Sequence, residues 1–189
     1  MRYKYETRGI VLSRTPAGEA NASITLITSG LGLVRARAQG VRRSGAKLAA
    51  ALATGTESEL VLVRGKEYWR IVGAVLEENW FVRLGNSSSR VRAARVSGLL
   101  LRLVPGEAHD PALFTIMNGF FEALTVFPED VHEAIEVLAA LRVLAALGLD
   151  AGEVPGGVST FTHPLLTAIM EERSGYIARI NHGIGASGL

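Results

Sequence analysis

The chain has 189 residues, of which 48% are hydrophobic and 6% aromatic, and it carries a formal net charge of +2. This length suits one ordinary domain or two small ones, and the hydrophobic content argues against a disordered chain. The sequence has no cysteine, which excludes disulfide bonds and thiol catalysis, and it has neither an apolar run of bilayer-spanning length nor a signal-peptide core, so we expect a cytoplasmic protein without membrane contact.

The first 80 residues have the alternation of apolar and polar positions that is typical of β-strands. Ser29-Gly30-Leu31-Gly32 and Arg64-Gly65-Lys66 are hairpin turn signals, and a short helix fits at Ala46–Ala53. The predicted strands are Tyr3–Ser13, Ser23–Thr28, Leu33–Gln39, Glu57–Val63 and Tyr68–Leu76. Five strands within about 75 residues indicate a small Greek-key barrel or a sandwich.

From Ser87 onward the apolar residues recur at helical spacing. Caps, prolines and glycines predict the helix ends, and Gly152–Ser159 is predicted to be a loop. The predicted helices run from a cap within Ser87-Ser88-Ser89 to about Val104, from Asp110-Pro111 to Phe127, over Glu129–Leu147, and from Thr162 through Glu172, with Gly175 as a point of interruption and fraying from Gly183. The chain is therefore expected to be α+β, with a β part followed by three or four helices.

Positive charge is concentrated in the β part. Residues 1–72 contain twelve Lys and Arg against five Glu, whereas residues 107–172 contain eleven acidic residues and one base, Arg142. No acidic residue occurs between Ala20 and Thr56. A concentrated positive charge on a small barrel is typical of a surface that follows a nucleic-acid backbone.

The acid-free window supplies the candidate phosphate contacts. Side chains alternate along a strand, so two of these arginines are expected to project from one face of the third strand. The predicted DNA-binding residues are Arg35, Arg37, Arg42, Arg43 and Lys47, with Arg14 extending the surface. We expect Trp69 to fill the core, and Tyr68, which shares a face with Arg70, to stack on bases. Secondary contacts are predicted at Tyr68, Arg70, Arg92 and Arg95, the last two of which can share a helical face.

Motifs for catalysis are not found. The segment from Gly40 to Lys47 approaches a nucleotide-binding loop, but Ala46 separates Gly45 from Lys47, so the spacing fails. The histidines have neither metal-ligand spacing nor a triad arrangement; they are His109, His132, His163 and His182. We therefore expect a non-enzymatic protein without metal or cofactor. Two alternatives stay open at this point: a barrel that binds RNA, and a protein-interaction adaptor whose basic face meets an acidic partner.

The N-terminal part also resembles a known family, the bacterial recombination mediator RecO. The segments that carry the resemblance are Gly9-Ile10-Val11-Leu12, Gly18-Glu19 ahead of Thr25-Leu26-Ile27-Thr28, Gly32, and Ala38-Gln39-Gly40-Val41-Arg42-Arg43 followed by Ser44, Lys47 and Leu48. The ending, Ile180-Asn181 and Ser187-Gly188-Leu189, is similar to the tails of short members.

The resemblance implies an oligonucleotide/oligosaccharide-binding (OB) barrel over residues 1–80 and an all-helical domain over residues 81–189. It implies binding of single- and double-stranded DNA, annealing of complementary strands, and loading of recombinase together with a RecR-like protein. It further implies contact with the tail of the single-stranded DNA-binding protein, which an apolar groove of the helical part would receive. Many members hold a four-cysteine zinc site, which this cysteine-free chain cannot form.

Overall fold

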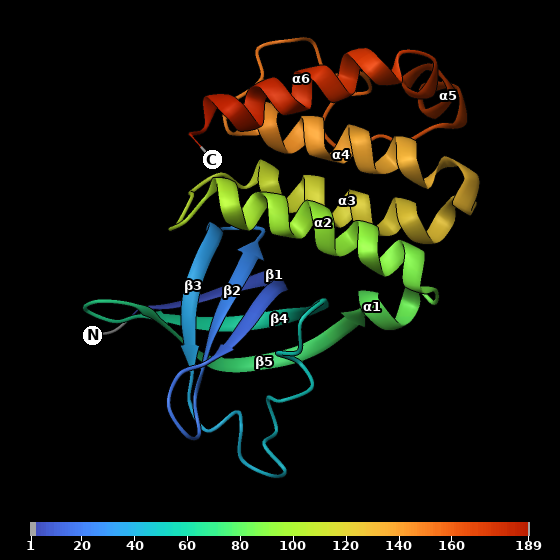
Figure 1. Ribbon diagram of the computed structural model, residues 1–189. Helices are drawn as coiled ribbons and strands as arrows, with labels where there is room; N and C mark the ends of the chain where they lie inside the picture. Colours follow the sequence, from blue (N-terminus) through green and yellow to red (C-terminus); the bar gives the residue numbers. More distant parts are fainter. Residues whose placement is uncertain (1–2, 189) are drawn as a thin grey trace. The chain divides into compact units, whose positions relative to one another are not determined.

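The computed structural model describes residues 3–188 and consists of five strands followed by helices (Figure 1). The predicted α+β class is therefore confirmed. Leu189, the last residue of the tail that carries the resemblance, lies outside the described residues. The chain divides into two compact units: the first runs up to Val82 and includes Gly106–Phe114, and the second comprises Arg83–Pro105 and the chain from Thr115 onward.

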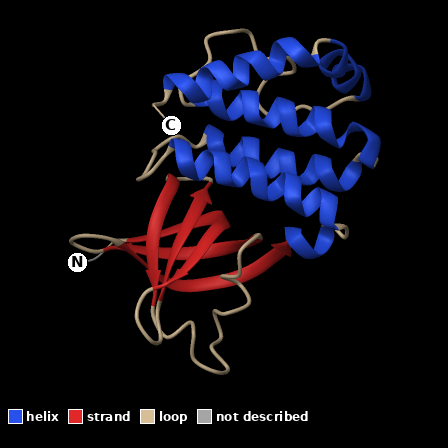
Figure 2. Ribbon diagram, viewed as in Figure 1, coloured by secondary structure: helices blue, strands red, loops and turns tan. Residues whose placement is uncertain are grey.

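The strands close into a barrel (Figure 2). Their order around it is β1-β2-β3-β5-β4; β3 and β5 run parallel, and the other neighbours are antiparallel. This order is that of an OB-type barrel, which confirms the expected fold. The strands are β1 (Lys4–Pro16), β2 (Ala22–Thr28), β3 (Gly32–Ala38), β4 (Thr56–Arg64) and β5 (Trp69–Asn79).

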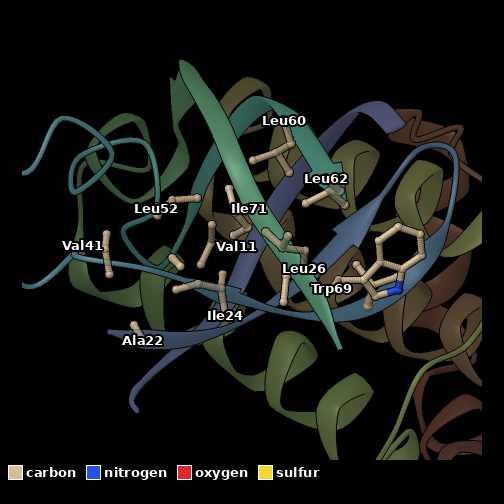
Figure 3. Packing of buried hydrophobic residues seen from close by; sticks show 13 residues of the cluster. Val11, Ala22, Ile24, Leu26, Val41, Leu52, Leu60, Leu62, Trp69 and Ile71 are labelled. Atoms are coloured by element: carbon tan, nitrogen blue, oxygen red, sulfur yellow. The ribbon is translucent and has the colours of Figure 1, made fainter. Parts of the chain in front are cut away.

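Alternating positions of the strands fill the barrel. On β3 the small residues Ala36 and Ala38 are buried, whereas the intervening Arg37 is exposed. Trp69 is 5% exposed and packs edge-on against Tyr5, with 5.1 Å between ring centroids, so its predicted core position is confirmed. Figure 3 shows the cluster, in which Val41 and Leu52 reach the strands from a loop.

The loop over residues 39–55, which joins β3 to β4, contains turns but no helix. The short helix predicted at Ala46–Ala53 is therefore wrong. Backbone carbonyl groups of this segment accept hydrogen bonds from side chains instead. Those of Ala49 and Leu52 accept from the Arg14 guanidinium, and that of Ala51 accepts from the Thr56 and Ser58 hydroxyl groups. These tertiary bonds override the helix propensity of an alanine-rich segment.

The segment Gly106–Phe114 pairs with the barrel although it lies beyond the expected boundary at residue 80. Leu33 and Ala108 exchange both backbone hydrogen bonds, at 2.8 and 3.0 Å. Gly32 makes this approach possible: its φ is +70°, and a Cβ there would meet the Ala108 carbonyl oxygen and the Asp110 amide nitrogen. Glycine is the residue that tolerates both conditions.

The helices are α1 (Trp80–Arg83), α2 (Ser87–Leu103), α3 (Ala112–Val126), the 3₁₀ turn η1 (Glu129–Val131), α4 (His132–Ala146), α5 (His163–Glu171) and α6 (Arg173–Ala186). Polar side chains cap the N-terminal ends of α2, α3 and α5. Asn86 caps α2, since its Oδ1 accepts from Ser89 N at 2.7 Å, so the predicted serine cap is wrong. Asp110 Oδ1 accepts from Ala112 N, as expected for a cap.

The C-terminal helices differ from the prediction in two ways. The break between α5 and α6 falls at Glu172 rather than at Gly175, which lies inside α6. Gly183 also belongs to α6 and is buried against α4, where a Cβ would meet the Leu149 carbonyl oxygen. Close packing thus keeps this glycine-rich end helical instead of frayed. Among the described residues, every helix is too short or too polar to cross a bilayer.

Candidate nucleic-acid interface

Arginine, serine and threonine side chains share the outer face of four barrel strands. In one row, Thr15 pairs with Ser23, Ser23 with Arg37, and Arg37 with Arg70. In the next row, Thr25 pairs with both Ser13 and Arg35. Paired residues of a sheet project to the same side. We call Arg35, Arg37 and Arg70 the basic face; the predicted alternation of Arg35 and Arg37 with buried alanines agrees with their exposure.

Tyr68 lies against this face. The Arg37 guanidinium carbon is 4.1 Å from the centroid of the Tyr68 ring, a cation–π geometry. Tyr68 and Arg70 also line a pocket of ≈ 260 Å³ beside the β4–β5 turn, together with Lys66. The Arg70 Nε atom is buried and has no hydrogen-bond partner among the described residues. The structure therefore brings the predicted stacking residue and its neighbour next to Arg37.

The remaining predicted cations lie on the loop over residues 39–55, which we call the basic loop. Arg42, Arg43 and Lys47 are exposed on it. The loop begins with a tether to the β1–β2 turn: Arg42 N donates to Ala20 O at 3.0 Å, and Arg42 Nη1 donates to Gly18 O at 2.6 Å. One of the five N–H groups of Arg42 is thus engaged, and its side chain is still exposed to solvent.

Arg14 has a different environment from the other predicted contacts. It pairs with Ile24, which pairs with Ala36, and this row faces the barrel interior. Its guanidinium donates to the carbonyl oxygens of Val41 and Ala49 at 3.2 Å and to that of Leu52 at 3.4 Å. The side chain is half-buried behind the basic loop. The structure therefore does not bring Arg14 onto the basic face.

Glu57 and Glu107, two acidic residues of the first unit, pair with other cations. Glu57 is 1% exposed and accepts hydrogen bonds from Arg8 and from Trp80 Nε1, and the bond and charge of Glu57 raise the pKa of Arg8. Arg64 pairs with Glu107 at 3.3 Å. Within residues 3–188, no ion pair involves the cations of the basic face or of the basic loop. Their charge is therefore free to attract an anion.

The two arginines predicted on α2 lie in the helical unit, where Glu136 of α4 contacts both. Arg92 forms an ion pair with this carboxylate, and Arg95 Nη1 lies 3.5 Å from its Oε1. They border a groove of ≈ 500 Å³ between α2, α4 and α6. Its apolar lining consists of Val96, Leu99, Val137, Ala140, Ile177, Ile180 and Ile184. The resemblance implies an apolar groove in the helical part but assigns no residues to it, although Ile177, Ile180 and Ile184 have the spacing of one helix face.

Comparison with known proteins gives one family. The family described as "Recombination protein O N terminal" matches residues 1–80, which include the basic face and the basic loop. A protein of Heliobacterium modesticaldum named "DNA repair protein RecO" is 32% identical over 158 residues, covering 79% of this chain and 56% of that protein. A protein of the same name from Dehalococcoides mccartyi is 32% identical over 123 residues, covering 65% of this chain and 48% of that protein. Another, from a Roseiflexus species, is 34% identical over 121 residues, covering 64% of this chain and 42% of that protein.

The chain spans about half the length of the curated relatives it matches. The residues matched by the family contain the N-terminal segments that carry the sequence resemblance, so the recognition of RecO is confirmed. Residues 1–80 of this chain therefore match the RecO N-terminal family, and the chain is similar to proteins named DNA repair protein RecO.

Proposed function

We propose that this protein is a non-catalytic, DNA-binding recombination mediator. The observation that carries the proposal is the set of exposed cations, unpaired with any described acidic residue, on β3 and on the basic loop of an OB-type barrel that matches the RecO N-terminal family. OB-type barrels commonly bind single strands along a positively charged groove. Relatives that share up to 34% identity are named DNA repair proteins. We assign DNA binding to residues 1–80 and partner contacts to the helical domain of residues 81–189.

Backbone recognition follows from the residue types on the barrel. The guanidinium groups of Arg35, Arg37 and Arg43 offer planar forks of N–H donors that fit phosphate oxygens. The hydroxyl groups of the same outer face, such as Ser23 and Thr15, can add hydrogen bonds to phosphate. Such contacts carry no sequence information, so we expect single- and double-stranded DNA of unrelated sequences to bind with similar affinity within each form.

Annealing of complementary strands is consistent with this mode of binding. A strand held by its phosphates leaves the Watson–Crick edges of its bases free to pair. Neutralising the phosphates also lowers the repulsion between two strands that approach each other. Tyr68 can hold one unpaired base by stacking, a contact that every base can make.

Partner binding is assigned to the groove of the helical domain. An apolar floor with Arg95 at its border fits a peptide end with apolar side chains and a carboxylate, since the Arg95 side chain is 63% exposed and its contact with Glu136 is long. We propose that this groove receives the tail of the single-stranded DNA-binding protein, and that a RecR-like protein acts with this chain in loading recombinase.

Salt-dependent binding to single- and double-stranded oligonucleotides tests the proposal. Replacing Arg42 and Arg43 together by alanine should weaken binding similarly for unrelated sequences and should lower the slope of log affinity against log salt by roughly 1.4 on single strands. Arg64→Met is a matched control, because the charge of Arg64 is already paired with Glu107. An unchanged slope in the double variant would remove the basic loop from the site.

Two further measurements decide between the proposal and its alternatives. In competition between DNA and RNA of matched sequence, we expect the protein to prefer DNA. A preference for RNA would support the alternative function, an RNA-binding protein, over the proposed mediator. If DNA binding disappears at about 150–200 mM salt while a complex with the acidic tail survives, the basic face belongs to a protein adaptor. An annealing assay with complementary strands should show acceleration that the Arg42→Ala/Arg43→Ala variant loses.

A further inference from the structure

We propose that Arg14 is a positioning residue, which holds the basic loop in the conformation that presents Arg42, Arg43 and Lys47 to phosphates. The inference rests on the proposed function, because the conformation of the basic loop affects binding only if the loop contacts phosphates. Arg14 acts through the loop backbone and does not itself contact the nucleic acid.

A β-bulge in β1 determines where Arg14 lies. Val11 pairs with Leu26 on the inner face, and regular pairing would continue with residue 12 opposite Thr25 and Arg14 opposite Ser23. Instead the register shifts between Val11 and Ser13, so that Ser13 pairs with Thr25 and Arg14 with Ile24. A bulge re-aims the side chains that follow it. Without it, Arg14 would join the outer row of Ser23 and Arg37; with it, Arg14 faces inward.

The inward guanidinium reaches three separate points of the basic loop. It donates to the carbonyl groups of Val41 at the start of the loop, and of Ala49 and Leu52 toward its end. Val41 and Leu52 are 2% and 0% exposed, so the same two residues are also anchored by their side chains in the barrel core (Figure 3). The three bonds connect the two ends of a segment without helix or strand.

The energetics favour a holding role over a phosphate contact. A hydrogen bond from a charged donor is stronger than one between neutral groups, and a planar guanidinium can serve three acceptors at once. Ordering a flexible residue costs conformational entropy. When the fold has already ordered the loop, DNA binding does not bear this cost, which is the usual benefit of preorganisation. Lysine could not replace Arg14, because a single ammonium nitrogen lacks the planar fork.

Three variants of the full chain separate the two roles: Arg14→Met, Arg14→Lys, and Arg43→Met as the matched loss of an exposed loop cation. In Arg43→Met we expect the salt slope on single-stranded DNA to fall by about 0.7. In both Arg14 variants we expect about tenfold weaker binding with an unchanged slope, which corresponds to about one lost charged hydrogen bond. Amide hydrogen exchange over residues 41–54 should accelerate in both Arg14 variants and not in Arg43→Met, while β4 stays protected.

Two outcomes would contradict the holding role of Arg14. If Arg14→Lys binds like the wild type and Arg14→Met lowers the salt slope by about 0.7, Arg14 is a direct phosphate contact. Unchanged exchange over residues 41–54 would also exclude the holding role. If the wild type shows no salt-dependent DNA binding, the proposed function fails, and the exchange measurement still decides whether Arg14 holds the loop. Arg14→Lys keeps the buried stem and serves as the folded variant if Arg14→Met does not fold.

Discussion

Arg37 and Arg70 lie directly opposite each other on the parallel strands β3 and β5. Like charges in this position are destabilising, and no described acidic residue pairs with either one. The Tyr68 ring, 4.1 Å from the Arg37 guanidinium carbon, offsets part of the repulsion. A pair of cations that the fold leaves uncompensated is what a phosphate-binding surface requires.

Replacing Arg70 by glutamine should therefore separate stability from binding. We expect the free energy of unfolding to rise by a few tenths of a kcal/mol at low salt, because the variant removes like-charge repulsion. We expect single-stranded DNA to bind more weakly, with the salt slope lowered by about 0.7. Urea unfolding and fluorescence anisotropy measure the two effects. A loss of stability in Arg70→Gln would show that the arginine is structural, and the gain should shrink in high salt.

Tyr68 provides a test for single-strand contacts. Tyr68→Ala should weaken binding of single-stranded DNA by about 1–3 kcal/mol, since base stacking on an aromatic ring contributes this much. Duplex binding should change little, because paired bases are not available for stacking. Tyr68→Phe keeps the ring and serves as the control that should bind like the wild type. Equal losses for single and double strands would assign Tyr68 to the support of Arg37 instead.

Among the glycines of the barrel, Gly32 should be the one whose replacement by alanine lowers the free energy of unfolding most. Gly32→Ala combines a φ of +70° with a collision against the Ala108 carbonyl oxygen, so we expect a destabilisation of about 2–4 kcal/mol. Gly45→Ala is the matched control: its φ is +71°, but no atom lies within 4 Å of the added Cβ. There only the backbone cost of about 1–2 kcal/mol should remain. Equal midpoints of chemical unfolding in the two variants would contradict the close approach of Gly106–Phe114 to β3.

The basic face could be predicted because it depends on alternation alone. Arg35 and Arg37 lie between residues that are buried in an unbroken strand, and two-residue periodicity places them correctly. Arg14 could not be placed in this way, because one bulged residue in β1 reverses the face of every side chain after it. Nothing in the residues around Leu12 distinguishes this bulge from regular pairing.

Tertiary contacts explain the other differences from the sequence analysis. The alanines of residues 46–53 favour a helix locally, but the Arg14 guanidinium takes the Ala49 carbonyl group, which a helix would pair with Ala53 N; that amide donates to Ala50 O instead. Glu136 and Arg92 are 44 residues apart in sequence, so their pairing across α2 and α4 leaves no local signal. Local patterns thus predicted the elements and the charged surface, whereas long-range pairing decided the role of individual arginines.

Arg142 gives a prediction for the helical domain that depends on pH. This residue is 3% exposed, and its Nη2 donates to the carbonyl group of Thr160 at 2.6 Å and more weakly to those of Pro155 and Gly156. Its Nε and Nη1 atoms are buried without a described partner, and its guanidinium carbon lies 4.4 Å from the centroid of the Phe161 ring. Burial lowers the pKa of Arg142 to about 10.

The sign of the pH effect follows from this direction. Because the pKa is lower in the folded state, the unfolded chain binds the proton more tightly, and burying the charge destabilises the fold at every pH below about 10. This cost is relieved as the pH rises from about 10 toward the higher pKa of the guanidinium in the unfolded chain. Arg142→Met carries no titrating group, so it isolates the effect. We expect the difference in unfolding free energy between wild type and variant to be constant from about pH 6 to pH 9 and then to shift in favour of the wild type. Urea unfolding at pH values across this range measures the difference; a difference that stays constant above about pH 10 would contradict the lowered pKa of Arg142.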